Sequence, residues 1–143
     1  MTEALIGSWK LLSFVDVPEE GQPEYPHGKC PKGMITYTPE GYVSVHIMTD
    51  PPPATSSAKM PSEKWKELLD GYVAYFGTYA VDPTNMTVIH NIEGSNWPAY
   101  IGTTQTRNFK CSPDMLVLSG NYTRNATRYS YERIFQKIMK VTG

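Results

Sequence analysis

The sequence predicts an all-β protein, an eight-stranded antiparallel up-and-down barrel with one short helix between the third and fourth strands. Short segments of alternating apolar and polar residues recur along the 143 residues, separated by Gly, Pro, Asn and Asp. Aromatic residues, which favour strands, make up 12% of the chain. Eight strands in meander order can close into a barrel that has no exposed edges. A β-sandwich is the alternative architecture.

The first three strands are expected at residues 8–16, 33–38 and 42–48. A polar loop with four prolines separates the first strand from the second. The segment Thr38-Pro39-Glu40-Gly41 joins the second strand to the third, because Pro and Gly suit a tight turn.

One helix is expected after the prolines that stop the third strand. It begins at Ser62, and its apolar stripe follows helical spacing through Trp65, Leu68, Leu69 and Tyr72. Gly71 is expected to end it, and the helix would lie across one opening of the barrel. The remaining strands are expected at residues 73–81, 86–93, 101–110, 115–120 and 126–137.

Composition favours one domain over residues 1–143. The net charge of −1 offers no attraction to nucleic acid or to an anionic membrane. The N-terminus lacks the features of a secretory signal, and Cys30 and Cys111 show no metal or disulfide spacing. We therefore expect a cytoplasmic protein with free thiols. The sequence leaves a homodimer open.

Several common catalytic motifs are missing from the sequence. It contains no glycine-rich phosphate loop and no Gly-x-Ser-x-Gly elbow. His27, His46 and His90 lie on separate segments, without metal-ligand spacing. We therefore expect neither a metal nor a cofactor.

An ordered set of segments resembles the lipocalin-like domain family of small stand-alone barrels. Residues 5–11 contain a Gly-x-Trp that is similar to the opening of calycin barrels, and residues 71–79 are the most distinctive match. Further similar segments follow the order of the family at residues 33–42, 90–95, 102–107 and 131–133. The resemblance implies the barrel fold and that Arg133 packs on Trp9 near a closed end. Similar small barrels encoded beside biosynthetic genes include cofactor-independent cyclases and isomerases.

Strand alternation predicts that Arg107 points into the barrel. In the sixth strand, the phase that holds Ile101 and Phe109 also holds Gln105 and Arg107. A buried guanidinium needs an anion or several acceptors, so Arg107 is a candidate anchor for a carboxylate, enolate or carbonyl oxygen. The structural alternative is an internal ion pair or a charge at the rim.

The two strand histidines are further candidates. His90 shares the apolar phase of the fifth strand with Val88 and Ile92, which places it inside. There it is either an acid or base near neutral pH or a hydrogen-bonded core residue. In the third strand, apolar patterning places His46 outside, whereas a polar pocket would place it inside.

The facing of the eighth strand stays open from the sequence. One face holds Tyr129, Tyr131, Arg133 and Phe135, and the other holds Arg128, Ser130, Glu132 and Ile134. If Glu132 faces inward, the low dielectric of a pocket would raise its pKa toward a catalytic range.

The sequence favours a cofactor-independent isomerase or cyclase that acts on a hydrophobic secondary metabolite. The expected catalytic residues are Arg107, His90 and Glu132. The expected substrate-binding residues are Tyr37, His46, Tyr75, Trp97, Gln105, Phe109 and Tyr131. One alternative is a non-catalytic binder or carrier of a hydrophobic ligand. Another is a protein-interaction module anchored by Trp65 and Trp97.

Overall fold

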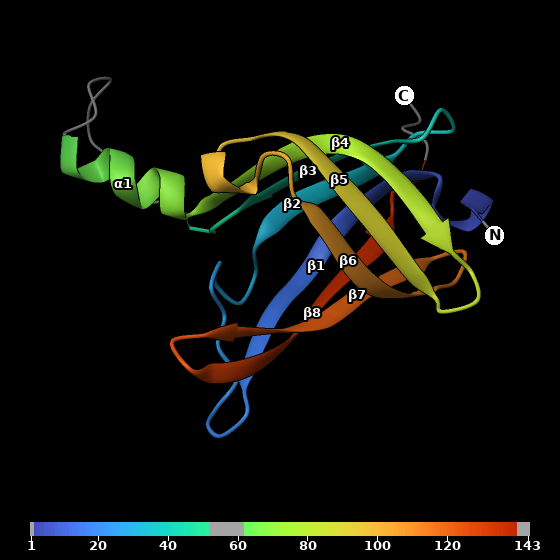
Figure 1. The fold of residues 1–143 in the computed structure, drawn as a ribbon. Coiled ribbons are helices and arrows are strands. Elements are labelled where there is room, and N and C mark those ends of the chain that lie inside the picture. Colours follow the sequence, from blue (N-terminus) through green and yellow to red (C-terminus); the bar gives the residue numbers. More distant parts are fainter. Residues whose placement is uncertain (1, 52–61, 140–143) are drawn as a thin grey trace.

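Eight antiparallel strands close into a barrel in the order in which they occur along the chain (Figure 1). The computed structural model describes residues 2–51 and 62–139. The strands are β1 (Gly7–Pro18), β2 (Lys32–Tyr37), β3 (Tyr42–Met48), β4 (Tyr72–Asp82), β5 (Thr87–Ser95), β6 (Thr104–Cys111), β7 (Met115–Arg124) and β8 (Thr127–Lys137). One α-helix, α1 (Ser62–Asp70), lies between β3 and β4, and two 3₁₀ helices are η1 (Thr2–Leu5) and η2 (Pro98–Tyr100). The predicted barrel is confirmed.

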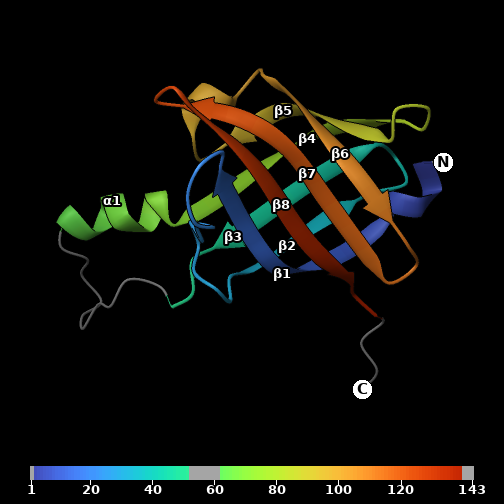
Figure 2. The ribbon, with the colours of Figure 1, turned by 90° about the horizontal axis from the view of Figure 1, so that it is seen from below.

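The seam between β1 and β8 closes the barrel. The two strands pair from Trp9 opposite Lys137 to Pro18 opposite Tyr129, with an irregularity between Leu11 and Ser13. Figure 2 shows the two strands side by side. This pairing joins the two ends of the meander, so the architecture is a barrel and not a sandwich.

Strand alternation determines which side chains fill the interior. In β3, Val43, Val45 and Ile47 are buried. In β5, His90 is buried together with Val88 and Ile92. Successive side chains of a strand point to opposite faces, so the apolar phases of β3 and β5 predict the inner faces of these two strands.

One end of the barrel is closed by apolar side chains. Leu5 and Trp9 are fully buried, and the Trp9 indole Nε1 donates to the Leu5 carbonyl at 2.9 Å. The Lys137 ammonium lies 4.4 Å from the centre of the Trp9 ring system. The implied packing of Arg133 on Trp9 is wrong, because the register places Lys137 opposite Trp9 and Arg133 opposite Phe14. The Arg133 guanidinium instead lies 3.4 Å from the Phe14 ring centre.

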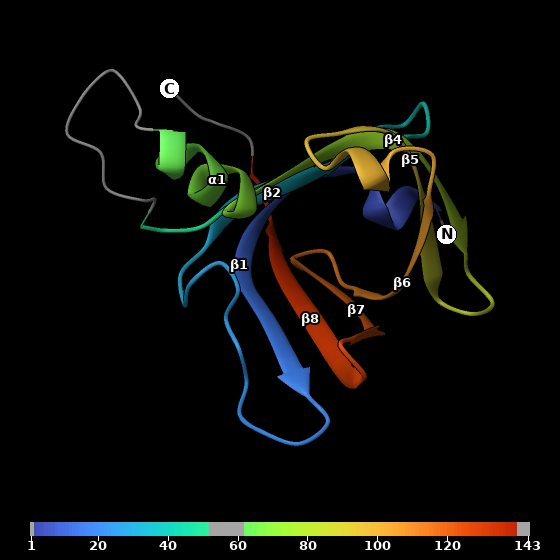
Figure 3. The same cartoon turned by 60° about the vertical axis from the view of Figure 1, so that its left-hand side comes forward.

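The helix α1 lies at the other end and projects away from the barrel (Figures 1 and 3). The helix ends at Asp70. Tyr72, which the sequence places on the apolar stripe of the helix, belongs to β4 instead. Leu69 and Asp70 line the cavity described below, whereas Trp65 is exposed. The helix therefore contributes to the rim but does not lie across the opening.

Candidate functional site

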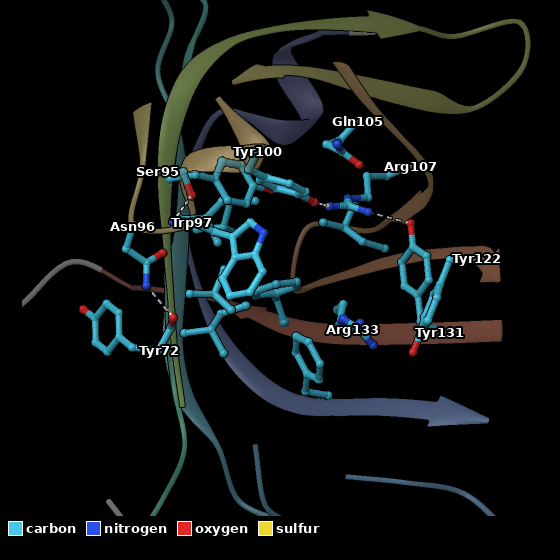
Figure 4. Close-up of a pocket in the computed structure, with 18 of the residues that line it drawn as sticks. Tyr72, Ser95, Asn96, Trp97, Tyr100, Gln105, Arg107, Tyr122, Tyr131 and Arg133 are labelled. Atoms are coloured by element: carbon cyan, nitrogen blue, oxygen red, sulfur yellow. Dashed lines mark hydrogen bonds between the residues drawn. The ribbon is translucent and has the colours of Figure 1, made fainter. Parts of the chain in front are cut away.

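The barrel holds a cavity of about 570 Å³ at the end that carries α1 (Figure 4). All eight strands contribute residues to its walls, and α1 and the segment around η2 form its rim. The aliphatic and aromatic wall residues include Phe14, Ile35, Val45, Ile47, Val73, Tyr75, Leu118 and Phe135. Such a largely apolar concave site with a few polar groups is the usual form of a small-molecule site.

The rim is fixed by Asn96. Its side-chain amide donates to the Tyr72 carbonyl at 2.7 Å, and its side-chain oxygen accepts from the Ala74 N–H at 3.0 Å. These bonds attach the loop after β5 to the start of β4. They hold Trp97 at the rim, where its side chain is 60% exposed.

Arg107 is the main charged group of the cavity. Its guanidinium donates from Nη1 to the Tyr131 hydroxyl at 3.0 Å and from Nη2 to the Tyr100 hydroxyl at 2.9 Å (Figure 4). No ion pair among residues 2–51 and 62–139 includes Arg107. Burial lowers the pKa of Arg107, but the surrounding phenol groups outweigh this effect and the net direction is upward. The cavity therefore contains a cation whose partners are neutral hydroxyls.

The second arginine of the cavity is already neutralised. Arg133 forms an ion pair with Asp16, and both side chains are largely buried, at 15% and 7% exposed. The Tyr122 hydroxyl donates to the other carboxylate oxygen of Asp16 at 2.6 Å. Burial and this hydrogen bond raise the pKa of Tyr122 to about 12. The uncompensated positive charge of the interior thus belongs to Arg107.

His90 is sealed in the barrel wall between two tyrosines. Its Nε2 lies 2.8 Å from the Tyr37 hydroxyl, and its Nδ1 lies 2.7 Å from the Tyr75 hydroxyl. Burial, assisted by the charge of Arg107, lowers the pKa of His90 to about 3. The imidazole is therefore neutral at physiological pH. Tyr75 lines the cavity, so His90 can influence a ligand through Tyr75.

The structure brings together several of the residues predicted to form the site. Arg107 shares the cavity with Tyr75, Trp97, Gln105 and Tyr131. Tyr37 and Phe109 are buried in the core, at 1% and 5% exposed, and Tyr37 contacts His90. The inward placement of Arg107 and His90 agrees with the strand phases.

Two predicted site residues lie on the outer face of the barrel. His46 is exposed, because Val45 and Ile47 take the inward positions of β3, and it lies 3.3 Å from the Tyr72 hydroxyl. Glu132 is exposed because Tyr131 and Arg133 take the inward positions of β8. A catalytic Glu132 or a ligand-binding His46 would have to face the interior, and neither side chain does. Both residues were therefore wrongly predicted to belong to the site.

Sequence reasoning missed two phenols of the site. Tyr122 lies in the second half of β7, beyond residue 120, where the strand is expected to end. It shares the inward phase of Leu116 and Leu118, so a longer predicted strand would have placed it inside the barrel. Tyr100 lies in η2, where no alternation exists to predict its direction. It belongs to a short turn of the chain before β6.

The fold and the cavity are those of a β-barrel with room for a small hydrophobic molecule. The model of the Lipocalin-like domain family matches the chain over residues 6–137, and the protein belongs to this family. Binding of a small hydrophobic ligand is the general property that this fold implies. No curated protein matches the chain.

Two further observations concern other kinds of site. In the described ranges, no three His, Cys, Asp or Glu side chains come together as metal ligands would. None of the described helices has the length and apolar character needed to cross a membrane.

Proposed function

We propose that the protein isomerises or cyclises a hydrophobic small molecule without a cofactor, holding one oxygen of that molecule at Arg107. The observation that carries this proposal is the charged Arg107 guanidinium in a largely apolar cavity, with phenol hydroxyls as its partners. A buried cation of this kind is stabilised by an anion or by an oxygen that gains negative charge.

The cavity supports catalysis by orientation and by stabilisation of charge. Rigid aromatic walls restrict the conformation of a bound molecule, and orientation alone can lower a barrier by several kcal/mol. Arg107 would stabilise negative charge that develops on a carbonyl oxygen. His90 is sealed in the wall and Glu132 lies outside, so neither is available as a base in direct contact with the substrate. This arrangement favours a reaction driven by polarisation of an oxygen, such as cyclisation without net proton transfer.

The same arrangement also favours a second candidate function, a non-catalytic carrier. A carrier needs the apolar cavity and one anchor, and both are present. The two functions differ in what happens to the ligand: an enzyme releases an isomer, whereas a carrier returns the molecule unchanged.

Incubation of the purified protein with a small-molecule extract of its source cells, followed by mass spectrometry, tests the proposal. We expect one compound to decrease while an isomer of the same mass appears. Arg107→Met should slow this conversion about 100-fold or more, the usual effect of losing a donor to a developing oxyanion. The matched control is Arg128→Gln, which removes an exposed arginine from the outer face. A compound that is depleted and then recovered unchanged after denaturation would establish the carrier.

We also place this activity in the cytoplasm. Cys30 and Cys111 are both free thiols, which is typical of a reducing compartment.

A further inference from the structure

The hydrogen-bond chain Tyr37–His90–Tyr75 can exist in few protonation patterns. A neutral imidazole carries one N–H donor and one bare acceptor nitrogen. Both ring nitrogens lie within hydrogen-bond distance of a phenol, at 2.8 Å from Tyr37 and 2.7 Å from Tyr75. One tyrosine must therefore donate to His90, and the other must accept from it.

The burial of Tyr37 decides between the two patterns. Tyr37 is 1% exposed, and among the described residues the His90 Nε2 is the hydrogen-bond partner of its hydroxyl. If Nε2 carried the proton, the Tyr37 hydroxyl would accept it, and its own hydrogen would have no acceptor. Buried polar hydrogens without an acceptor are costly and rare in native proteins. The Tyr37 hydroxyl therefore donates to a bare Nε2.

The opposite pattern holds at Tyr75. With Nε2 bare, the proton lies on Nδ1, and Nδ1–H donates to the Tyr75 oxygen. Tyr75 lines the cavity, and its oxygen also accepts from the Arg107 guanidinium, so its own hydroxyl hydrogen remains available to a molecule bound there. If both ring nitrogens of His90 carried a proton, the hydroxyl hydrogen of Tyr37 would again have no acceptor.

We propose that His90 is a positioning residue, held as the Nδ1–H tautomer by Tyr37, which makes the Tyr75 hydroxyl a hydrogen-bond donor into the cavity. The ligand group that binds beside Tyr75 and Arg107 is then an acceptor oxygen: a carbonyl, an enolate or a carboxylate. This ligand class rests on the proposed function, whereas the tautomer is a property of the free protein.

Two-bond ¹H–¹⁵N correlation spectra of the ¹⁵N-labelled protein test the tautomer directly. The sequence holds three histidines, so His90 is compared with His27 and the exposed His46 after assignment. We expect the His90 ring to carry its proton on Nδ1 alone, with the same pattern at pH 7 and pH 5. A proton on Nε2, or on both nitrogens, would overturn the proposal. If His90 only filled space in the core, neither tautomer would be required.

Two dyes test the donor at Tyr75. Anilinonaphthalene sulfonate carries acceptor oxygens, and N-phenyl-1-naphthylamine has the same aromatic body without them. We expect Tyr75→Phe to weaken binding of the sulfonate about tenfold, as loss of a hydrogen bond to a charged acceptor does, and to leave the neutral dye unchanged. The matched control is Tyr79→Phe, which removes a hydroxyl that donates to the Thr38 carbonyl away from the cavity. Unchanged sulfonate binding in Tyr75→Phe would contradict the proposed donor.

The outcomes separate this proposal from the proposed function. The spectra need no ligand, so they decide the tautomer even if neither dye binds. If His90 carries its proton on Nδ1 but no compound of the extract is converted, the proposed enzyme activity is wrong and the proposed role of His90 stands. If a compound is converted but the proton lies on Nε2, the enzyme activity stands and the proposed role of His90 is wrong.

Discussion

At the residue scale, the buried ion pair of Asp16 and Arg133 gives the first prediction. Asp16→Asn removes the charge that compensates Arg133 and weakens the acceptor of the Tyr122 hydroxyl. Removing one partner of a buried pair leaves the other charge unpaired, and we expect a loss of about 3–5 kcal/mol in the free energy of unfolding. Urea denaturation measures it. Asp70→Asn is the control, because Asp70 pairs with Lys66 on the surface, and it should lose less than about 0.5 kcal/mol. Equal losses in the two variants would contradict the prediction.

His90 gives a prediction about pH. The pKa of His90 in the folded state is about 3, below its ordinary value of 6.5. Between these values the unfolded chain binds a proton that the folded protein does not, so stability falls as the pH falls below 6.5. Relative to His90→Gln, the wild type should lose stability with a slope approaching about 1.4 kcal/mol per pH unit. Urea denaturation of both proteins at pH 7, 6 and 5 measures the difference. A difference that is the same at all three pH values would exclude the burial of a neutral His90.

Single residues were predictable where a local pattern determined their direction. Alternation within β6 and β5 is enough to turn Arg107 and His90 inward. The hydrogen-bond partners of His90 come from β2 and β4, 53 and 15 residues away, and no local pattern encodes such contacts. The facing of Glu132 was ambiguous because both faces of β8 mix charged and apolar side chains.

At the scale of the elements, the turn between β7 and β8 carries backbone strain. Arg124 pairs with Thr127, so Asn125 and Ala126 form a two-residue loop, and their φ angles are 51° and 66°. Two-residue hairpin loops with positive φ at both positions favour Asn-Gly. Ala126→Gly should therefore raise the free energy of unfolding by about 1 kcal/mol, which urea denaturation can measure.

The control for this turn is Asn125→Gly, which should gain less because Asn tolerates the left-handed region. A loss of stability in Ala126→Gly would show that the strain is absent. The missing glycine also explains why β7 was predicted to end at Gly120, because no strong turn signal marks residues 125–126.

At the scale of the whole molecule, the two ends of the barrel differ. Trp9 is fully buried at the closed end, whereas Trp97 is exposed at the rim of the cavity. A ligand should therefore enter at the Trp97 end. We expect bound anilinonaphthalene sulfonate to slow amide hydrogen exchange in residues 95–100 and to leave residues 7–11 unchanged, as measured by mass spectrometry. Protection confined to residues 7–11 would place the binding site at the closed end and contradict the prediction.

The architecture followed from the sequence up to the closure of the barrel. Strand alternation and the turn residues are local, so they predict the number and order of the strands. The choice between barrel and sandwich depends on the pairing of β1 with β8, which lie more than 100 residues apart. The family resemblance supplied that information, since no local pattern does.

The same seam has a consequence for synthesis of the chain. β8 pairs with both β1 and β7, so a nascent chain whose residues 127–137 are still inside the ribosome leaves two sheet edges unpaired. Its interior stays open to water, and the Arg107 guanidinium remains hydrated until the final strand docks. Unpaired edges favour association with other chains, and long-range strand pairing is slow. The cavity therefore cannot exist until residues 127–137 have left the ribosome, and chaperones that bind exposed strands would act in that interval.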